Sequence, residues 1–98
     1  MQNVPEGRVE ITGKIIYTKW YEGDYGEVLQ CTIRDDRGFK VYGSVPTVIV
    51  DYAISEDLEL IGQRIRLTGT VRPSNDDPQF GYYKRPAKSQ LIQESALL

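Results

Sequence analysis

The chain has 98 residues, a length typical of one small domain, and 40% of them are hydrophobic, which is enough for a buried core. Its single cysteine excludes an internal disulfide, the lack of histidine removes the commonest general base and zinc ligand, and no apolar run approaches the ~20 residues of a membrane span. We therefore expect one soluble cytoplasmic domain, residues 1–98, with its ordered core at about 8–92 and no membrane partner.

The formal net charge of −2 gives little support to a protein that binds polyanions, but the acids are unevenly placed. Asp51, Glu56, Asp57 and Glu59 lie within nine residues that contain no Lys or Arg. These four acids carry −4, so the rest of the chain carries +2. A mildly basic body permits nucleic-acid binding without requiring it.

The first predicted strand covers Arg8–Trp20. Hydrophobic and polar residues alternate in its first half, and Gly13 marks a bulge or a bend. Two adjacent isoleucines then break the alternation, which leaves the direction of Tyr17 and Trp20 open. The next segment, Tyr21–Gly26, contains two glycines and an aspartate, and it is predicted to be an aromatic-rich loop.

Residues 27–45 carry the clearest pattern in the chain, that of a β-hairpin. Two alternating segments are joined by Asp35–Gly38, which has the Asp and Gly residues that tight turns use. Cys31 and Phe39 fall on the apolar faces, so we expect both in the core. The outward faces carry polar, charged and aromatic side chains: Gln30, Thr32, Arg34, Lys40 and Tyr42.

The segment Thr47–Leu60 is predicted to be a helix because its apolar residues recur at spacings of three and four. Thr47 would cap its start and Gly62 would follow its end. On this pattern Tyr52 would pack the helix onto the rest of the domain.

The remainder of the chain is predicted as two strands around a loop. The first strand covers Gln63–Arg72, and the loop Pro73–Pro78 consists almost entirely of turn-forming residues. The last strand covers Gln79–Arg85 and, beyond an interruption at Pro86, Ala87–Ile92.

The resulting order is strand, strand, strand, helix, strand, strand, with Gly13 and Gly69 as places where long strands can bend into a barrel. This order, together with GQRIRLTGTV at the fourth strand, resembles the OB-fold over about Arg8–Ile92. The resemblance implies an all-β, five-stranded Greek-key barrel with one short helix between strands 3 and 4. DDRGFKVYGSVP and FGYYKRP also resemble uncharacterised phage-encoded OB domains. An SH3-like barrel is the main alternative, although it would not readily accommodate the helix.

No catalytic residues, metal ligands or cofactor are predicted. The pairs Asp35–Asp36 and Asp76–Asp77 stand among turn formers, where Asp usually bonds its own backbone. No glycine-rich phosphate loop is present. We therefore expect a binding domain and not an enzyme.

The OB resemblance implies that a ligand lies across strands 2 and 3 and between the loops that join strands 1 and 2 and strands 4 and 5. Single strands of nucleic acid need flat rings for the bases and cations for the phosphates, and this surface would supply both. The predicted contact residues are Trp20, Tyr21, Tyr25, Thr32, Arg34, Lys40, Tyr42, Phe80, Tyr82, Tyr83, Lys84 and Arg85.

Alternatives remain open for several of these residues. Trp20 caps the end of the barrel or faces the ligand. Tyr82 and Tyr83 are adjacent on a strand and point to opposite faces, so only one of them can stack with a base. The fourth-strand arginines Arg64, Arg66 and Arg72 are expected on a solvated face outside the binding surface.

Two functions follow as expectations. The first is binding of single-stranded nucleic acid with little sequence preference, DNA favoured over RNA, as in an accessory protein of DNA replication or repair. The second is a protein-interaction or structural module whose aromatic surface contacts another protein or a second copy of the chain. Salt separates the two, because phosphate binding weakens steeply as salt rises.

Overall fold

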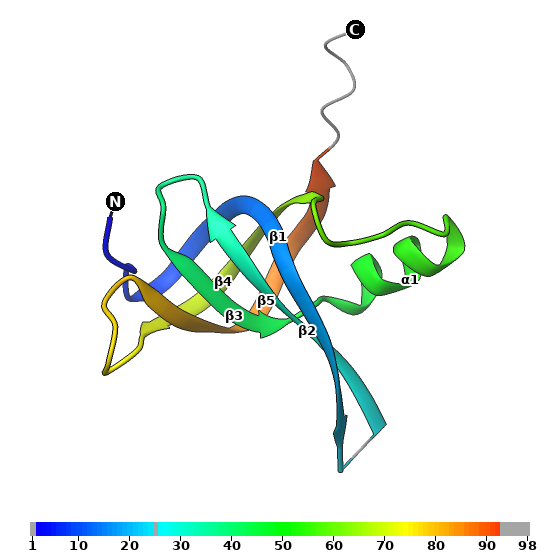
Figure 1. Cartoon of the computed structure of the whole chain (residues 1–98), viewed down its shortest axis with the longest axis horizontal. Coiled ribbons are helices and arrows are strands. Elements are labelled where there is room, and N and C mark those ends of the chain that lie inside the picture. Colours follow the sequence, from blue (N-terminus) through cyan, green and yellow to red (C-terminus); the bar gives the residue numbers. More distant parts are fainter. Residues whose placement is uncertain (1, 25, 93–98) are drawn as a thin grey trace, which may run out of the picture.

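The computed structural model describes residues 2–24 and 26–92. The chain forms the elements shown in Figure 1: β1 (Gly7–Gly23), β2 (Gly26–Asp35), β3 (Lys40–Ser44), α1 (Thr47–Ser55), β4 (Arg64–Pro73) and β5 (Phe80–Ile92). These elements follow the predicted order of three strands, one helix and two strands.

The strands close into a barrel in the order β1, β2, β3, β5, β4, and β4 pairs back to β1. All neighbours are antiparallel except β3 and β5, which are parallel. The helix follows β3 and lies to one side of the barrel (Figure 1). The predicted five-stranded barrel with one short helix between the third and fourth strands is therefore confirmed, and its strand order is consistent with an OB-like fold.

Every second side chain along the strands points inward, and these apolar side chains fill the barrel interior. Phe39 and Cys31, which were expected in the core, are both fully buried. The helix adds Ile49 and Ala53, which are four residues apart and share one face. Tyr52 does not pack onto the barrel as predicted: it is 41% exposed, because its position is turned about 100° from that of Ala53 around the helix.

β1 departs from a regular strand at two places. A Cβ atom on Gly13 would lie 1.9 Å from the carbonyl oxygen of Arg34, so only glycine allows β1 to approach β2 this closely. Further along, one extra β1 residue between Ile15 and Tyr17 shifts the register with β2. This bulge resolves the question left by the two adjacent isoleucines, because Tyr17 then lies on the outer face and is 52% exposed.

The prediction of a loop over Tyr21–Gly26 is wrong. β1 continues to Gly23, β2 starts at Gly26, and these two glycines are paired with each other. The paired segments 20–23 and 26–29, which have no third strand beside them, form a two-stranded extension, here called the β1–β2 ribbon, which projects beyond the barrel (Figure 1). Aromatic residues such as Trp20 and Tyr21 favour strands, which explains why strand pairing prevails here.

The predicted helix over Thr47–Leu60 is too long. The helix ends at Ser55, and Asp57 takes a left-handed φ of 52° that directs the chain into a loop. The predicted side-chain cap is also wrong, because Pro46 occupies the N-cap position and no side chain bonds the free N–H groups. Gly62, with φ of 97°, belongs to the turn before β4.

β4, the following loop and β5 match the predicted segments closely. β5 is continuous but carries two register shifts against β4. Arg85 and Lys88 take left-handed φ values of 54° and 52° at these bulges, and Pro86, which has no N–H to donate, lies between them. The predicted interruption at Pro86 is thus a bend within one strand.

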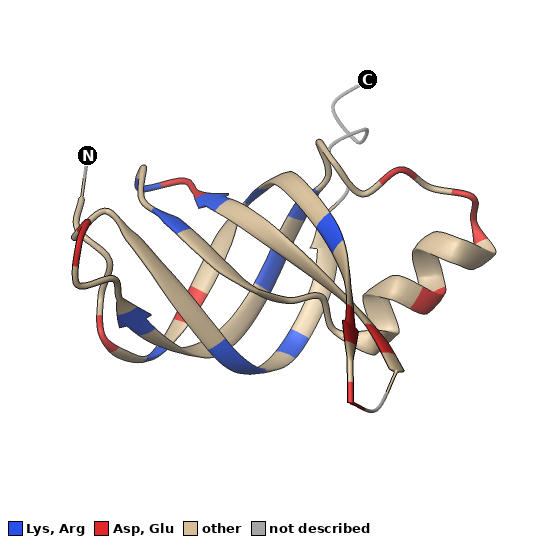
Figure 2. Cartoon of the chain, turned by 60° about the horizontal axis from the view of Figure 1, so that its bottom comes forward, with Lys and Arg blue, Asp and Glu red and all other residues tan. Residues whose placement is uncertain are grey.

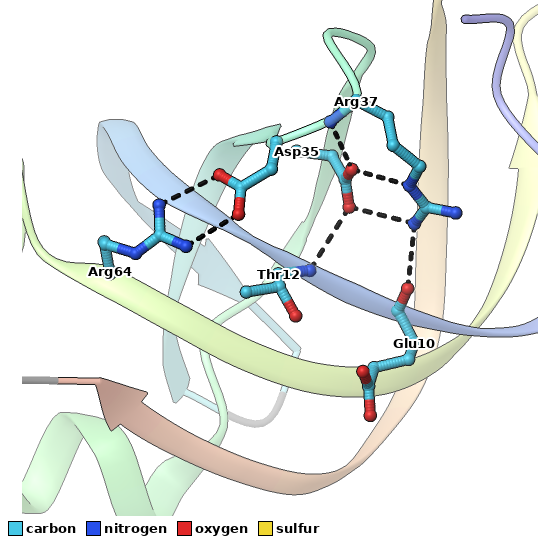
Figure 3. A network of polar contacts seen from close by, with 6 residues as sticks. Glu10, Thr12, Asp35, Arg37 and Arg64 are labelled. Carbon is cyan, nitrogen blue, oxygen red and sulfur yellow. Dashed lines mark hydrogen bonds and ion pairs between the residues drawn. The ribbon is translucent and has the colours of Figure 1, made fainter.

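A buried carboxylate ties the turn between β2 and β3 to β1 (Figure 3). Asp35 accepts hydrogen bonds from the backbone N–H groups of Thr12, at 3.2 Å, and Arg37, at 2.8 Å. The Arg37 guanidinium pairs with the same carboxylate and donates to the carbonyl oxygen of Glu10 at 3.0 Å. Because the 3%-exposed Asp35 is fully partnered, it stabilises this end of the barrel.

Candidate nucleic-acid interface

Three tyrosines and a threonine lie in one row across the outer face of the barrel. Tyr17 of β1 is paired with Thr32 of β2, which is paired in turn with Tyr42 of β3. Tyr42 is paired with Tyr82 of β5. We call Tyr17, Tyr42 and Tyr82 the tyrosine row. Neighbouring strands are about 4.8 Å apart, so the row crosses four strands and extends over about 14 Å.

The tyrosine row presents ring surface to solvent. Tyr17 and Tyr82 are 52% and 45% exposed, and Tyr42 is half-buried. Partial burial raises the pKa of Tyr42, and the phenols of Tyr21 and Tyr17 raise it further. Phe80 packs edge-on against Tyr82 with ring centroids 5.3 Å apart, and so supports that ring.

A row of cations runs beside the tyrosine row. Lys14 of β1 is paired with Arg34 of β2, and Arg34 with Lys40 of β3. All three residues are exposed, and we call them the basic row. It lies one outward-facing position from the tyrosine row, about 7 Å along the strands. Like charges directly opposite one another destabilise a sheet, so a bound anion would relieve the repulsion.

Cations also flank the two ends of the tyrosine row. At the β1 end, the ammonium of Lys19 lies 5.3 Å from the ring centre of Tyr21. At the β5 end, Arg72 of β4 is paired with Tyr82. A groove of about 890 Å³ adjoins this end, and Tyr82, Arg72 and Lys84 are among the residues that line it. Rings and cations therefore form one continuous surface across the barrel.

Trp20 and Tyr21, which were predicted to act together, lie on opposite faces of the ribbon. Tyr21 lies on the same face as Lys19, toward the tyrosine row. Trp20 lies on the opposite face, paired with Leu29, and it lines a groove beside α1. Trp20 therefore does not belong to the predicted surface. The third predicted ring of this segment, Tyr25, lies outside the described residues.

Two predicted residues of β5 are also placed elsewhere. Tyr83 is 3% exposed and packs inside the barrel against Gly43, so it cannot stack with a ligand; Tyr82 is the outward member of the pair. Arg85 lies beyond the row at a bulge, where its carbonyl oxygen accepts a hydrogen bond from Arg8. Other predicted residues are on or beside the surface: Tyr21, Thr32, Arg34, Lys40, Tyr42, Phe80, Tyr82 and Lys84.

Four residues of this surface were missed by sequence reasoning: Tyr17, Lys14, Lys19 and Arg72. The direction of Tyr17 depends on the bulge in β1, and the adjacent isoleucines were the only sequence signal of it. Arg72 was expected away from the surface because it belongs to the fourth strand. Its pairing with Tyr82 is a consequence of barrel closure, which brings β4 beside β5.

One aspartate of each predicted pair bonds the backbone of its own turn. Asp77 accepts a hydrogen bond from the backbone N–H of Gln79 at 2.9 Å, and Asp35 bonds the backbone of its own turn. Asp36 pairs with Arg64 at 2.6 Å, which holds the pKa of that carboxyl below its usual value. Over residues 2–24 and 26–92, no three Asp, Glu, Cys or His side chains are grouped so that they could hold a metal ion.

No helix in the described part of the chain has the length and apolar content needed to cross a membrane. No protein-family model, curated protein or solved structure matches the chain.

Proposed function

We propose that this chain is a binding module for single-stranded nucleic acid, with DNA favoured over RNA and little preference for sequence. The observation that carries the proposal is the tyrosine row with the basic row beside it. Tyr17, Tyr42 and Tyr82 lie across four strands, and three cations lie parallel to them. Rings that accept any base, next to cations that contact phosphates, are the pattern that sequence-tolerant binding requires.

The expected affinity comes mainly from stacking. Each base on an aromatic ring contributes about 1–3 kcal/mol, so three rings can hold a short strand although the net charge of the chain is −2. The cations act locally, because charges on the far side of the domain are screened over about 8 Å at physiological salt. Lys14, Arg34 and Lys40 therefore matter more to a bound strand than the net charge does.

The test is fluorescence anisotropy of a labelled oligo-dT of ~15 nucleotides, long enough to cross the surface, at low and physiological salt. We expect Tyr42→Ala to weaken binding by about fivefold or more, equivalent to ~1 kcal/mol, because it removes the central ring. Tyr52→Ala is the matched control, since Tyr52 is 41% exposed but belongs to α1, away from the row. It should bind as the wild type does.

Three outcomes would contradict the proposal: no binding at tens of micromolar protein in low salt, an equal loss in both variants, or binding that does not weaken with salt. Salt-insensitive self-association that is lost in Tyr42→Ala would favour the other function, in which the tyrosine row is a subunit interface. An oligo-rU of equal length tests the preference for DNA.

A further inference from the structure

A second surface lies between the β1–β2 ribbon and α1. It is a groove of about 350 Å³. Its floor contains Leu29, Ala53 and Leu60, which are buried in the core, and its walls contain Trp20 and Ile54, which are 52% and 69% exposed. Large apolar side chains that remain this exposed beside an apolar floor are typical of a surface that another molecule covers.

The surroundings of this groove are acidic. Asp57 and Glu59 line it, and Asp51 and Glu56 lie on or next to the same helix. Figure 2 shows Asp and Glu residues on α1, on the loop that follows and near the tip of the ribbon, whereas most Lys and Arg residues lie on the barrel strands. The residues that line the groove fall within 18–29 and 50–60, and the only Lys or Arg in these two segments is Lys19, which lies with Tyr21 on the opposite face of β1.

Two glutamates are held opposite each other on the groove side of the ribbon. Glu22 is paired across the strands with Glu27, and both are exposed. They lie two positions from Trp20 and Leu29 on the same face, because side chains alternate along a strand. Like charges in a cross-strand pair destabilise a sheet, and a cation placed between them would relieve that repulsion.

We propose that this groove binds a basic, amphipathic segment of a partner protein. Apolar side chains of the segment would enter between Trp20 and Ile54, and Lys or Arg residues on either side would pair with the acidic rim. Charge complementarity selects this occupant: the acids surround the apolar floor on both the helix and the ribbon, so an acidic peptide or a nucleic acid would be repelled. The groove lies on the face of the ribbon opposite Tyr21, so the proposal does not depend on the function of the tyrosine row.

The experiment uses a synthetic amphipathic peptide with Leu on one face and Lys on the other, together with two variants of it. One variant replaces every Lys with Glu, and the other replaces every Leu with Ser. Trp20 is the sole tryptophan of the sequence and reports directly on the groove. We expect the Lys/Leu peptide to shift the Trp20 emission to shorter wavelengths, the Glu/Leu peptide to leave it unchanged, and the Lys/Ser peptide to bind at least about tenfold more weakly.

Charge-reversed variants test the position of the site. Glu59→Lys should lower peptide affinity by about fivefold or more, whereas Asp76→Lys, the same charge change in the exposed loop between β4 and β5, should lower it by less than about twofold. The proposal is overturned by the absence of any emission shift with the Lys/Leu peptide or by equal losses in the two variants. It is also overturned if Trp20 emission shifts with protein concentration alone, since the occupant would then be a second copy. Nucleic acid is absent from this experiment, so its failure and that of the proposed function are distinguishable.

Discussion

Tyr83 carries a polar group into the interior of the barrel. Its hydroxyl donates a hydrogen bond of 2.7 Å to the carbonyl oxygen of Ser44 and lies 3.4 Å from the sulfur of Cys31. The pKa of the Cys31 thiol is raised from 9.0 to about 11, because burial raises it by more than the contact with Tyr83 lowers it. Burial also raises the pKa of Tyr83, and its contact with Cys31 acts in the same direction. Both groups are therefore neutral wherever the domain is folded at moderate pH.

This pair predicts a loss of stability in alkali. The unfolded chain releases the Cys31 proton near pH 9, whereas the folded chain keeps it to about pH 11, so the folded state binds more protons in between. The stabilisation is fully present below pH 9 and is lost as the pH rises to 11. The total loss of unfolding free energy over this interval is about 2 kcal/mol. Urea unfolding at neutral pH and across this interval measures it.

Cys31→Ala is the control for the alkaline loss, because it removes the thiol and leaves Tyr83 in place. The variant starts from a lower stability, since it leaves a small cavity. Its further decrease between pH 9 and pH 11 should be smaller than that of the wild type. Equal decreases in the two proteins would show that the thiol does not titrate differently in the folded and unfolded states.

At the scale of elements, the contact between β3 and β5 depends on Gly43. These strands form the one parallel pairing among the described residues, and it joins Tyr42 to Tyr82. A Cβ atom on Gly43 would lie 2.6 Å from the carbonyl oxygen of Tyr83 and 2.7 Å from its ring. No alternative rotamer removes a clash with a backbone oxygen, so the strands themselves would have to separate.

Gly43→Ala should therefore lower the free energy of unfolding by about 1–3 kcal/mol, the usual cost of overpacking a core, as measured by urea denaturation. Gly23→Ala in the ribbon is the matched control. Its Cβ would be 3.6 Å from the nearest atom, the carbonyl oxygen of Gly26, so the change should be within about 0.5 kcal/mol. An unchanged free energy of unfolding in Gly43→Ala would mean that β3 and β5 can move apart without loss of stability.

The same elements show what the sequence can and cannot predict. The hairpin of β2 and β3 was predictable because its alternation is local and its turn has Asp and Gly in sequence. The ribbon was not, because the two glycines and one aspartate in residues 23–26 suggest a loop as strongly as a tight hairpin turn. The direction of Tyr17 depends on one extra residue in β1, and the place of Arg72 depends on pairing with β5. Neither can be derived without the register.

At the scale of the whole molecule, charge and fold divide the domain into two sides. Asp and Glu residues gather on α1, on the loop after it and on the ribbon, whereas most Lys and Arg residues lie on the barrel strands (Figure 2). The first group includes Asp57 and Glu59, which line the groove at Trp20, and the second includes the basic row beside the tyrosine row. A net charge of −2 hides this separation. Because screening limits each field to about 8 Å at physiological salt, the two sides can act on different partners.

Two arginines on β4 test this division within one strand. Arg72 is paired with Tyr82, whereas Arg66 is paired with Gln90 on a different part of the barrel wall. They are six residues apart, or about 20 Å, which is more than twice the screening length. Each substitution by Ala removes one positive charge from the chain.

If phosphates follow the tyrosine row, Arg72→Ala should weaken oligo-dT binding and reduce the slope of log affinity against log salt by about 0.7, the share of one phosphate contact on a single strand. Arg66→Ala should leave the slope unchanged. Anisotropy titrations at four or more salt concentrations measure both slopes. Equal reductions in the two variants would show that binding responds to the net charge of the domain. That result would contradict a path of the bound nucleic acid across β3, β5 and β4.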